Sequence, residues 1–185
     1  MLAGFATFIA LQCDLLCDSL RKIPKEKYVL NKYVEHHWKI LSFAKDTETL
    51  FSQIYFGQFI NSTLAYCMTL FLLTLVDRTS FEFFYLVFYQ TSMFCLLLVP
   101  CWFSSEITTK SKNIPIAAYE CFWTDKPNYF KKDLLFFIHM SQEPIKLYAI
   151  GFFHISVEIF VKILRLSLSY FAVLNNLMGN ESENK

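Results

Sequence analysis

The stretch Thr49–Val76, TLFSQIYFGQFINSTLAYCMTLFLLTLV, decides the fold of this chain, because its 28 residues include no Asp, Glu, Lys or Arg. A second stretch, Phe83–Ser105, is free of these four residue types over 23 positions. Both are longer than the roughly 20 residues that a helix needs to cross a bilayer. Of the 185 residues, 55% are hydrophobic and 21 are Phe, a composition typical of membrane proteins. The sequence therefore predicts membrane-spanning helices.

A third apolar run, Leu147–Met178, contains three charged residues on one helical face. Glu158, Lys162 and Arg165 fall on that face at about 100° per residue. A charge at mid-bilayer costs roughly 2.5–3.5 kcal/mol, so such groups face a bundle interior or water. Two interpretations stay open: this face lines a water-filled pore, or Glu158 and Lys162 form an i,i+4 ion pair between packed helices. The same face continues toward the C-terminus through three further residues: Ser169, Val173 and Asn176.

The positive charges predict the topology. Seven Lys and Arg residues lie from Arg21 to Lys45 and six from Lys110 to Lys146, whereas residues 77–82 hold only Arg78. The two basic stretches are therefore expected on the cytoplasmic side, and the C-terminus outside. The expected segments of this single membrane domain are 1–20 (partial span), 21–48 (cytoplasmic), 49–76 (span), 77–82 (outside), 83–105 (span), 106–146 (cytoplasmic), 147–178 (pore-type span) and 179–185 (outside).

The N-terminal segment and the cytoplasmic segments complete the predicted architecture. Leu2–Cys13 is apolar over only 12 residues, so it is expected to be half of a membrane helix and the chain a fragment. Pro24–Lys45 and Tyr129–Met140 have helical apolar spacing and predict cytoplasmic helices, with Asp46-Thr47 as a cap or bend. Another helix is expected directly after Pro144. The predicted fold is an all-α integral membrane helical bundle with three full transmembrane helices, a partial N-terminal one and cytoplasmic anchor helices.

Several classes of function are not expected. The net charge is +1 without a basic cluster, so no nucleic acid partner is predicted. The motifs GxSxG, GxGxxG and HExxH are absent from the sequence, so neither an enzyme nor a cofactor is expected. Four scattered histidines favour no metal site: His36, His37, His139 and His154. Six aromatic residues at the start of the second charge-free stretch either anchor the helix at the headgroups or line an apolar pocket: Phe81, Phe83, Phe84, Tyr85, Phe88 and Tyr89.

Four groups of residues, in the correct order, resemble the C-terminal half of an insect odorant receptor. The first matches the entry to the fifth span of that family: His37, Ile40-Leu41, Phe43, Glu48, Phe51-Ser52, Gln58-Phe59 and Ser62. The second matches the end of the sixth span: Ser104-Ser105-Glu106, Ala118-Tyr119 and Trp123. The third and fourth match a cytoplasmic signature and the closing motif of the seventh span: Ser141-Gln142 with Pro144, then Ser169-Tyr170-Phe171 with Val173-Leu174 and Leu177. Two positions depart from the pattern, with Met140 where the family often has Arg and Glu143 where it often has Lys.

This resemblance implies an odorant-gated, non-selective cation channel subunit of the plasma membrane, acting in olfaction as a heterotetramer with a co-receptor subunit. It implies that Val173 forms the hydrophobic constriction of the pore, with Asn176 and Leu177 beside it. Glu158, Lys162 and Arg165 would then face the inner pore or adjacent helices. A volatile odorant would contact five residues of the fifth and sixth spans: Tyr66, Thr69, Tyr85, Phe88 and Tyr89. Two alternatives stay open, a gustatory receptor relative and a non-conducting membrane scaffold or pseudogene product.

Overall fold

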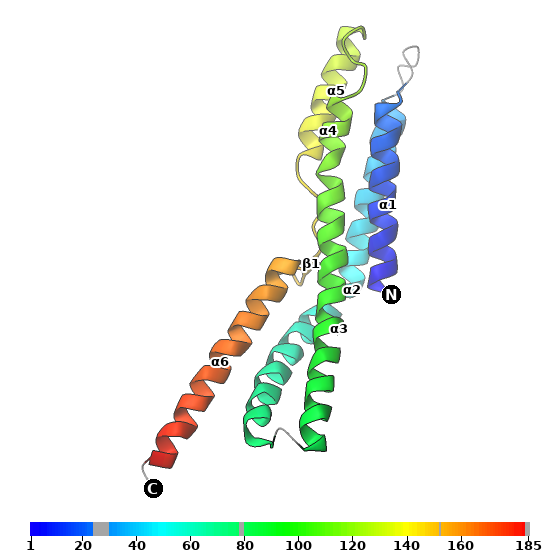
Figure 1. Ribbon diagram of the computed structural model, residues 1–185. Helices are drawn as coiled ribbons and strands as arrows, with labels where there is room; N and C mark the ends of the chain where they lie inside the picture. Colours follow the sequence, from blue (N-terminus) through cyan, green and yellow to red (C-terminus); the bar gives the residue numbers. More distant parts are fainter. Residues whose placement is uncertain (24–29, 78–79, 152, 184–185) are drawn as a thin grey trace. The chain divides into compact units, whose positions relative to one another are not determined.

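A computed structural model describes the chain except for residues 24–29, 78–79, 152 and 184–185, and in the last helix it describes side chains as far as Val173. The described residues form six helices and one short hairpin (Figure 1). In chain order the elements are α1 (Leu2–Arg21), α2 (Asn31–Leu75), α3 (Phe81–Ser111), α4 (Asn113–Tyr119), α5 (Asn128–Ser141), β1 (Tyr148–Ala149), β2 (Phe153–His154) and α6 (Val157–Glu183). The expected all-α membrane bundle is confirmed.

Three helical stretches of the described residues are long and apolar enough to cross a membrane. They are α1, α2 and Phe81–Tyr119, which joins α3 and α4. A bilayer contains no water to bond free N–H and C=O groups, and helices satisfy these groups internally. α6 carries Glu158, Lys162 and Arg165 in its first turns, and its described part is not among these three stretches.

The chain divides into two compact units. Unit 1 consists of Met1–Ser52 and Phe103–Ile155, and unit 2 of Gln53–Trp102 and Ser156–Lys185. α2 and α3 each contribute to both units, because the helices run without a break through residues 52–53 and 102–103. Unit 2 therefore contains most of both charge-free stretches, whereas unit 1 contains the basic segments of the sequence.

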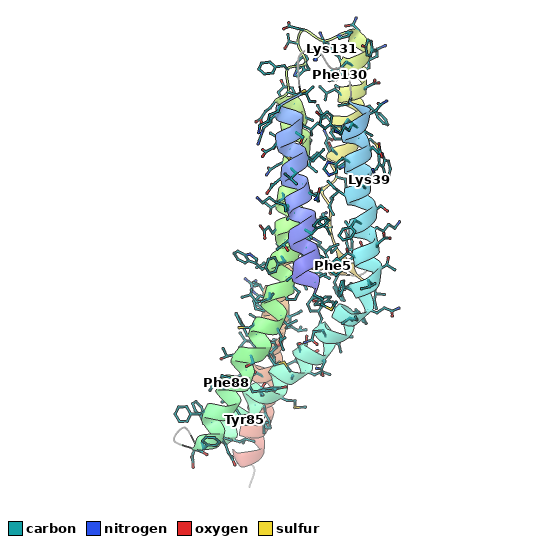
Figure 2. All side chains as sticks on the ribbon, turned by 90° about the vertical axis from the view of Figure 1, so that its right-hand side faces the viewer. Phe5, Lys39, Tyr85, Phe88, Phe130 and Lys131 are labelled. Carbon is teal, nitrogen blue, oxygen red and sulfur yellow. The ribbon has the colours of Figure 1, made fainter. Side chains whose placement is uncertain are left out.

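In unit 1, α1 packs beside the first part of α2. The Phe5 ring contacts those of Phe43 and Phe51, each at 5.8 Å between centroids, and Phe8 contacts Phe43 at 5.5 Å. Figure 2 shows Phe5 on the side of α1 that faces α2. Further along, His36 Nε2 and Gln12 Oε1 lie 3.0 Å apart. The two helices are therefore antiparallel, and α1 lies beside the part of α2 that precedes most of its charge-free stretch.

The remaining helices of unit 1 build a second layer of contacts. α1 packs on α4, and α4 packs on α5, and Ala117 and Ala118 of α4 are fully buried. Two ion pairs join α1 to α3 and to the end of α4, Lys110 Nζ to Asp14 Oδ2 and Arg21 Nε to Glu120 Oε2, both at 2.7 Å. Exposed pairs contribute less than about 1 kcal/mol each. The buried apolar contacts therefore hold the unit together, and the ion pairs orient its helices.

The segment between α5 and α6 is extended, and hydroxyl groups satisfy its backbone. Ser111 Oγ accepts a hydrogen bond from the Ile145 N–H at 2.9 Å, and Thr108 Oγ1 donates to the Ile145 carbonyl at 3.0 Å. β1 and β2 then pair antiparallel, with Tyr148 opposite His154. Between them Ile150 and Gly151 have positive φ angles of 51° and 69°, and the Ile150 N–H donates to Ser52 Oγ. Side chains of α2 and α3 thus fix the path of this segment.

Two expectations about helix boundaries were wrong. The helix expected directly after Pro144 begins only at Val157, because the backbone of the intervening residues bonds to side chains of α2 and α3 and pairs in the hairpin. α6 starts where Ser156 Oγ accepts a hydrogen bond from the Ile159 N–H, at the N-cap position. Asp46-Thr47, expected as a cap or bend, is not a cap, because it lies inside α2, where Thr47 Oγ1 donates to the Phe43 carbonyl at 2.8 Å. By contrast, Tyr129–Met140 is helical as predicted, within α5.

Replacement of Ser111 by Ala leaves the buried Ile145 N–H without its acceptor. We expect a loss of about 1–3 kcal/mol in local stability, the cost of a buried unsatisfied donor. Amide hydrogen exchange of the purified chain in detergent measures this as faster deuterium uptake in residues 142–147. Ser19→Ala is the control, because Ser19 is exposed. Equal uptake in both variants would contradict the role assigned to Ser111.

Candidate functional site

Unit 2 contains a polar contact between two apolar helices. Thr69 Oγ1 on α2 donates to Gln90 Oε1 on α3 at 2.6 Å. One turn away, Tyr66 is 2% exposed and its hydroxyl has no hydrogen-bond partner among the described residues. Ser62, another turn along α2, is fully buried and accepts a hydrogen bond from Gln58 Nε2 at 3.2 Å. Tyr66 and Thr69 therefore belong to the packed contact between α2 and α3.

The other predicted odorant contacts lie on a different face of α3. Tyr85 and Phe88 are 62% and 75% exposed, and Tyr89 is half-buried. Figure 2 shows Tyr85 and Phe88 on the same stretch of α3. At about 100° per residue, Gln90 lies about 140° around the helix from Tyr85. The structure thus brings Tyr66 together with Thr69, and Tyr85 together with Phe88 and Tyr89, but it does not bring the two groups together.

α6 has two faces of opposite character. On one face Phe160 is buried and its ring contacts that of Phe94 on α3, at 4.9 Å and 78°. Ser167, also buried, lies on the same face. The predicted polar face lies roughly 180° away at 3.6 residues per turn, and five of its predicted residues are exposed: Glu158, Lys162, Arg165, Ser169 and Val173. The side chains of Asn176 and Leu177 lie outside the described residues.

The ion pair considered for this face is present in α6. Lys162 Nζ lies 2.7 Å from Glu158 Oε1, with both side chains more than half exposed. The pair lies within one helix and on its outer side, so the packing of α6 in unit 2 does not bury it. Pairing reduces the cost of placing two charges in an apolar surrounding, and it leaves the face polar.

In unit 1, His37 is buried between α2 and α5. Its ring contacts that of Phe137 edge to face, at 5.4 Å between centroids and 80°. Burial, together with the neighbouring His36, lowers the pKa of His37 below its ordinary value. The imidazole is therefore neutral at pH 7, and it acts as part of the apolar contact between the two helices.

The sequence matches one family model over most of its length. That model, described as 7tm Odorant receptor, matches residues 1–168. The chain belongs to the insect odorant receptor family. It is thus a multi-pass membrane protein of a receptor family with a role in olfaction, and members of this family are not enzymes.

Known odorant receptors align with most of this chain. It is 26% identical over 146 residues to Odorant receptor 10 of Aedes albopictus, covering 79% of this chain and 39% of that receptor. It is 24% identical over 184 residues to Odorant receptor 30a of Drosophila melanogaster, covering 97% of this chain and 48% of the relative. The chain thus spans less than half the length of these two odorant receptors.

The fold is also that of a solved insect odorant receptor. The structure of the olfactory receptor OR5 from Machilis hrabei in complex with eugenol superposes with a TM-score of 0.83 at 20% identity. The superposition covers 93% of this chain and 45% of that receptor. A second structure of the same Machilis hrabei receptor superposes with a TM-score of 0.82 at 20% identity. These similarities show the fold that the odorant receptor sequence adopts here.

Sequence reasoning missed two features of this odorant receptor chain. Gln90 was not singled out, although an amide inside an apolar span often marks a contact between helices. Thr108 and Ser111 were not recognised as partners of the segment after α5, because nothing in their local sequence shows which distant backbone they bond.

Replacement of Thr69 by Val removes the hydroxyl that donates a hydrogen bond to Gln90. We expect a loss of about 0.6 kcal/mol, and at most about 1.7 kcal/mol, in the free energy of unfolding, the average and maximum for hydrogen bonds between membrane helices. The measurement is thermal unfolding of the chain in detergent. Thr63→Val is the matched control, because Thr63 Oγ1 donates to the Phe59 carbonyl of its own helix. Equal losses in both variants would mean that the bond between helices adds nothing.

Proposed function

We propose that this chain is the pore-forming and anchoring half of an odorant-gated cation channel subunit in the plasma membrane, with its C-terminus outside. Family membership supports a receptor role. The positive-inside pattern supports the orientation, since the basic segments flank the charge-free stretches on one side. The observation that carries the proposal is the exposed polar face of α6.

α6 suits a pore helix because its buried and polar faces are separate. Phe160 and Ser167 pack within unit 2, whereas Glu158, Lys162 and Arg165 point away from that packing. In a bilayer such a face needs water or other polar groups. Equivalent helices from several subunits around an axis would enclose a water-filled path and place polar groups beside this face. Val173, further along, then contributes an apolar ring that closes the path by excluding water.

The proposed ligand is a small, largely apolar volatile. The receptor from Machilis hrabei was solved in complex with eugenol. In this chain the exposed aromatic face of α3, Tyr85, Phe88 and Tyr89, offers apolar surface that a ligand or neighbouring helices of the receptor can bury. Burial contributes about 25 cal/mol per Å² of apolar surface. The contact of Tyr66 and Thr69 behind that face would transmit a displacement of α3 to α2.

The proposed partner is a co-receptor subunit in a heterotetramer, held through unit 1. α5 presents Leu135 outward with 73% of its surface exposed, on the side away from the buried Phe130, Leu134 and Phe137. Leu135 thus gives the outer side of α5 an exposed apolar side chain in a segment predicted to be cytoplasmic. Apolar surface of this kind marks an interaction site in soluble regions of proteins.

The test of the pore is replacement of Val173 by Ala. The chain, joined to the N-terminal half of a related receptor and expressed with a co-receptor, is studied by recording basal and odorant-evoked currents. Loss of two methyl groups removes apolar contact that stabilises the closed pore by roughly 1–1.6 kcal/mol. We therefore expect the basal current to rise about fivefold or more.

Leu168→Ala is the control for this pore test, because Leu168 lies about 140° around α6 from Val173 and is also exposed. Equal basal currents in the two variants would contradict the assignment of Val173. Normal surface expression without any odorant-evoked current would instead favour a non-conducting scaffold.

The assembly surface is tested by replacing Leu135 with Glu. The change places a charge on an exposed position, so the chain itself should fold with unchanged thermal stability. We expect co-purification with the co-receptor to fall about tenfold, because a buried unpaired charge at an interface costs several kcal/mol. Thr124→Glu, at an exposed position outside α5, adds the same charge and is the control. Undiminished co-purification of Leu135→Glu would exclude this surface from the interface.

A further inference from the structure

Unit 1 contains a groove between α2 and α5 that the proposed function does not use. Its volume is about 330 Å³, within the range of small-molecule sites. The buried rings of His37 and Phe137 form its floor, and the exposed Trp38, Phe136 and Met140 form its sides. The groove lies entirely within unit 1, whereas all five candidate odorant contacts lie in unit 2.

The charge in this groove is negative. Among the described residues that line it, Asp133 is the one with a formal charge, and it forms no ion pair within the described chain. His37 adds no opposing charge, because burial lowers its pKa and keeps the imidazole neutral at pH 7. A ligand in the groove therefore meets a carboxylate beside three aromatic side chains, Trp38, Phe136 and Phe137.

Aromatic faces beside a carboxylate favour one ligand chemistry. The ring faces of Trp and Phe attract cations, and Trp does so most strongly. An anion would be repelled by Asp133, and a purely apolar ligand would cover that carboxylate without compensating its lost hydration. A compact ammonium group with an apolar body satisfies both the carboxylate and the rings.

We propose that the groove between α2 and α5 binds a small organic cation, with its ammonium group beside Asp133 and its apolar body against Trp38 and Phe136. This site is separate from the proposed odorant site and from the outward surface at Leu135. It does not depend on whether the chain forms a channel.

The test compares one cation with its uncharged isostere. Benzyltrimethylammonium and neopentylbenzene have the same shape and differ in charge. The purified 185-residue chain in detergent is titrated with each by calorimetry. We expect the cation to bind about tenfold more tightly than the isostere, the ratio that a partly desolvated ring and carboxylate give.

Variants of the lining and of the surface locate the binding site. Asp133→Asn should weaken binding of the cation about tenfold and should leave binding of the isostere equal or stronger, because the amide costs less to desolvate than the carboxylate. Trp38→Leu should weaken the cation more than the isostere, because it removes a ring face and keeps an apolar side chain. Asp125→Asn removes an exposed carboxylate outside the groove and should change neither affinity. Asp133 and Trp38 are both exposed, so these variants should fold as the parent chain does.

Three results would overturn the proposal. The first is no binding of the cation by the parent chain. The second is equal affinity for cation and isostere, or a cation affinity that Asp133→Asn leaves unchanged. The third is binding by the monomer with none by oligomers separated on a sizing column, since a second copy of the chain would then fill the groove.

Discussion

The need to satisfy backbone hydrogen bonds in an apolar surrounding governs this structure. Through the charge-free stretches the chain meets it by forming α2 and α3, which run for 45 and 31 residues. The segment between α5 and α6 is not helical, and hydroxyl groups of distant residues bond to its backbone instead. Ser111 and Thr108 bond both backbone groups of Ile145, and Ser52 accepts from Ile150. The non-helical segment between α5 and α6 is therefore the part of the chain that hydrogen bonds connect to α2 and α3.

These hydrogen bonds allow the segment between α5 and α6 to transmit movement. It connects α5, which carries the proposed assembly surface, to the start of α6, which carries the proposed pore face. Because side chains of α2 and α3 bond to its backbone, a movement of either helix is transmitted to the segment through these hydrogen bonds. The backbone of a flexible loop would absorb such a movement. An odorant-gated channel needs a connection of this kind between ligand-binding helices and pore helix.

Two polar pairs in unit 2 lie in different surroundings. Thr69 and Gln90 satisfy one another between helices, whereas Glu158 and Lys162 pair along the outer side of α6. The first arrangement fixes the packing of α2 on α3. The second leaves a charged surface that needs water or another subunit. The same distinction holds in unit 1, where the ion pairs of α1 lie at the surface and the imidazole of His37 is buried against Phe137.

The sequence by itself determined the fold class, the charge-free stretches that fill most of α2 and α3, the helix at 129–140 and the shared face of Glu158, Lys162 and Arg165. These follow from local rules, since composition and the 3.6-residue period act within a single segment. Only the tertiary structure decided that α1 lies beside the first part of α2, that a short hairpin precedes α6, and that the five predicted odorant contacts divide into two groups. Each of these depends on a partner far away in the chain: Phe43 and Phe51 for Phe5, Ser111 for Ile145, and Gln90 for Thr69. Periodicity indicates which face of a helix is polar or apolar, but it cannot say which other helix will cover that face.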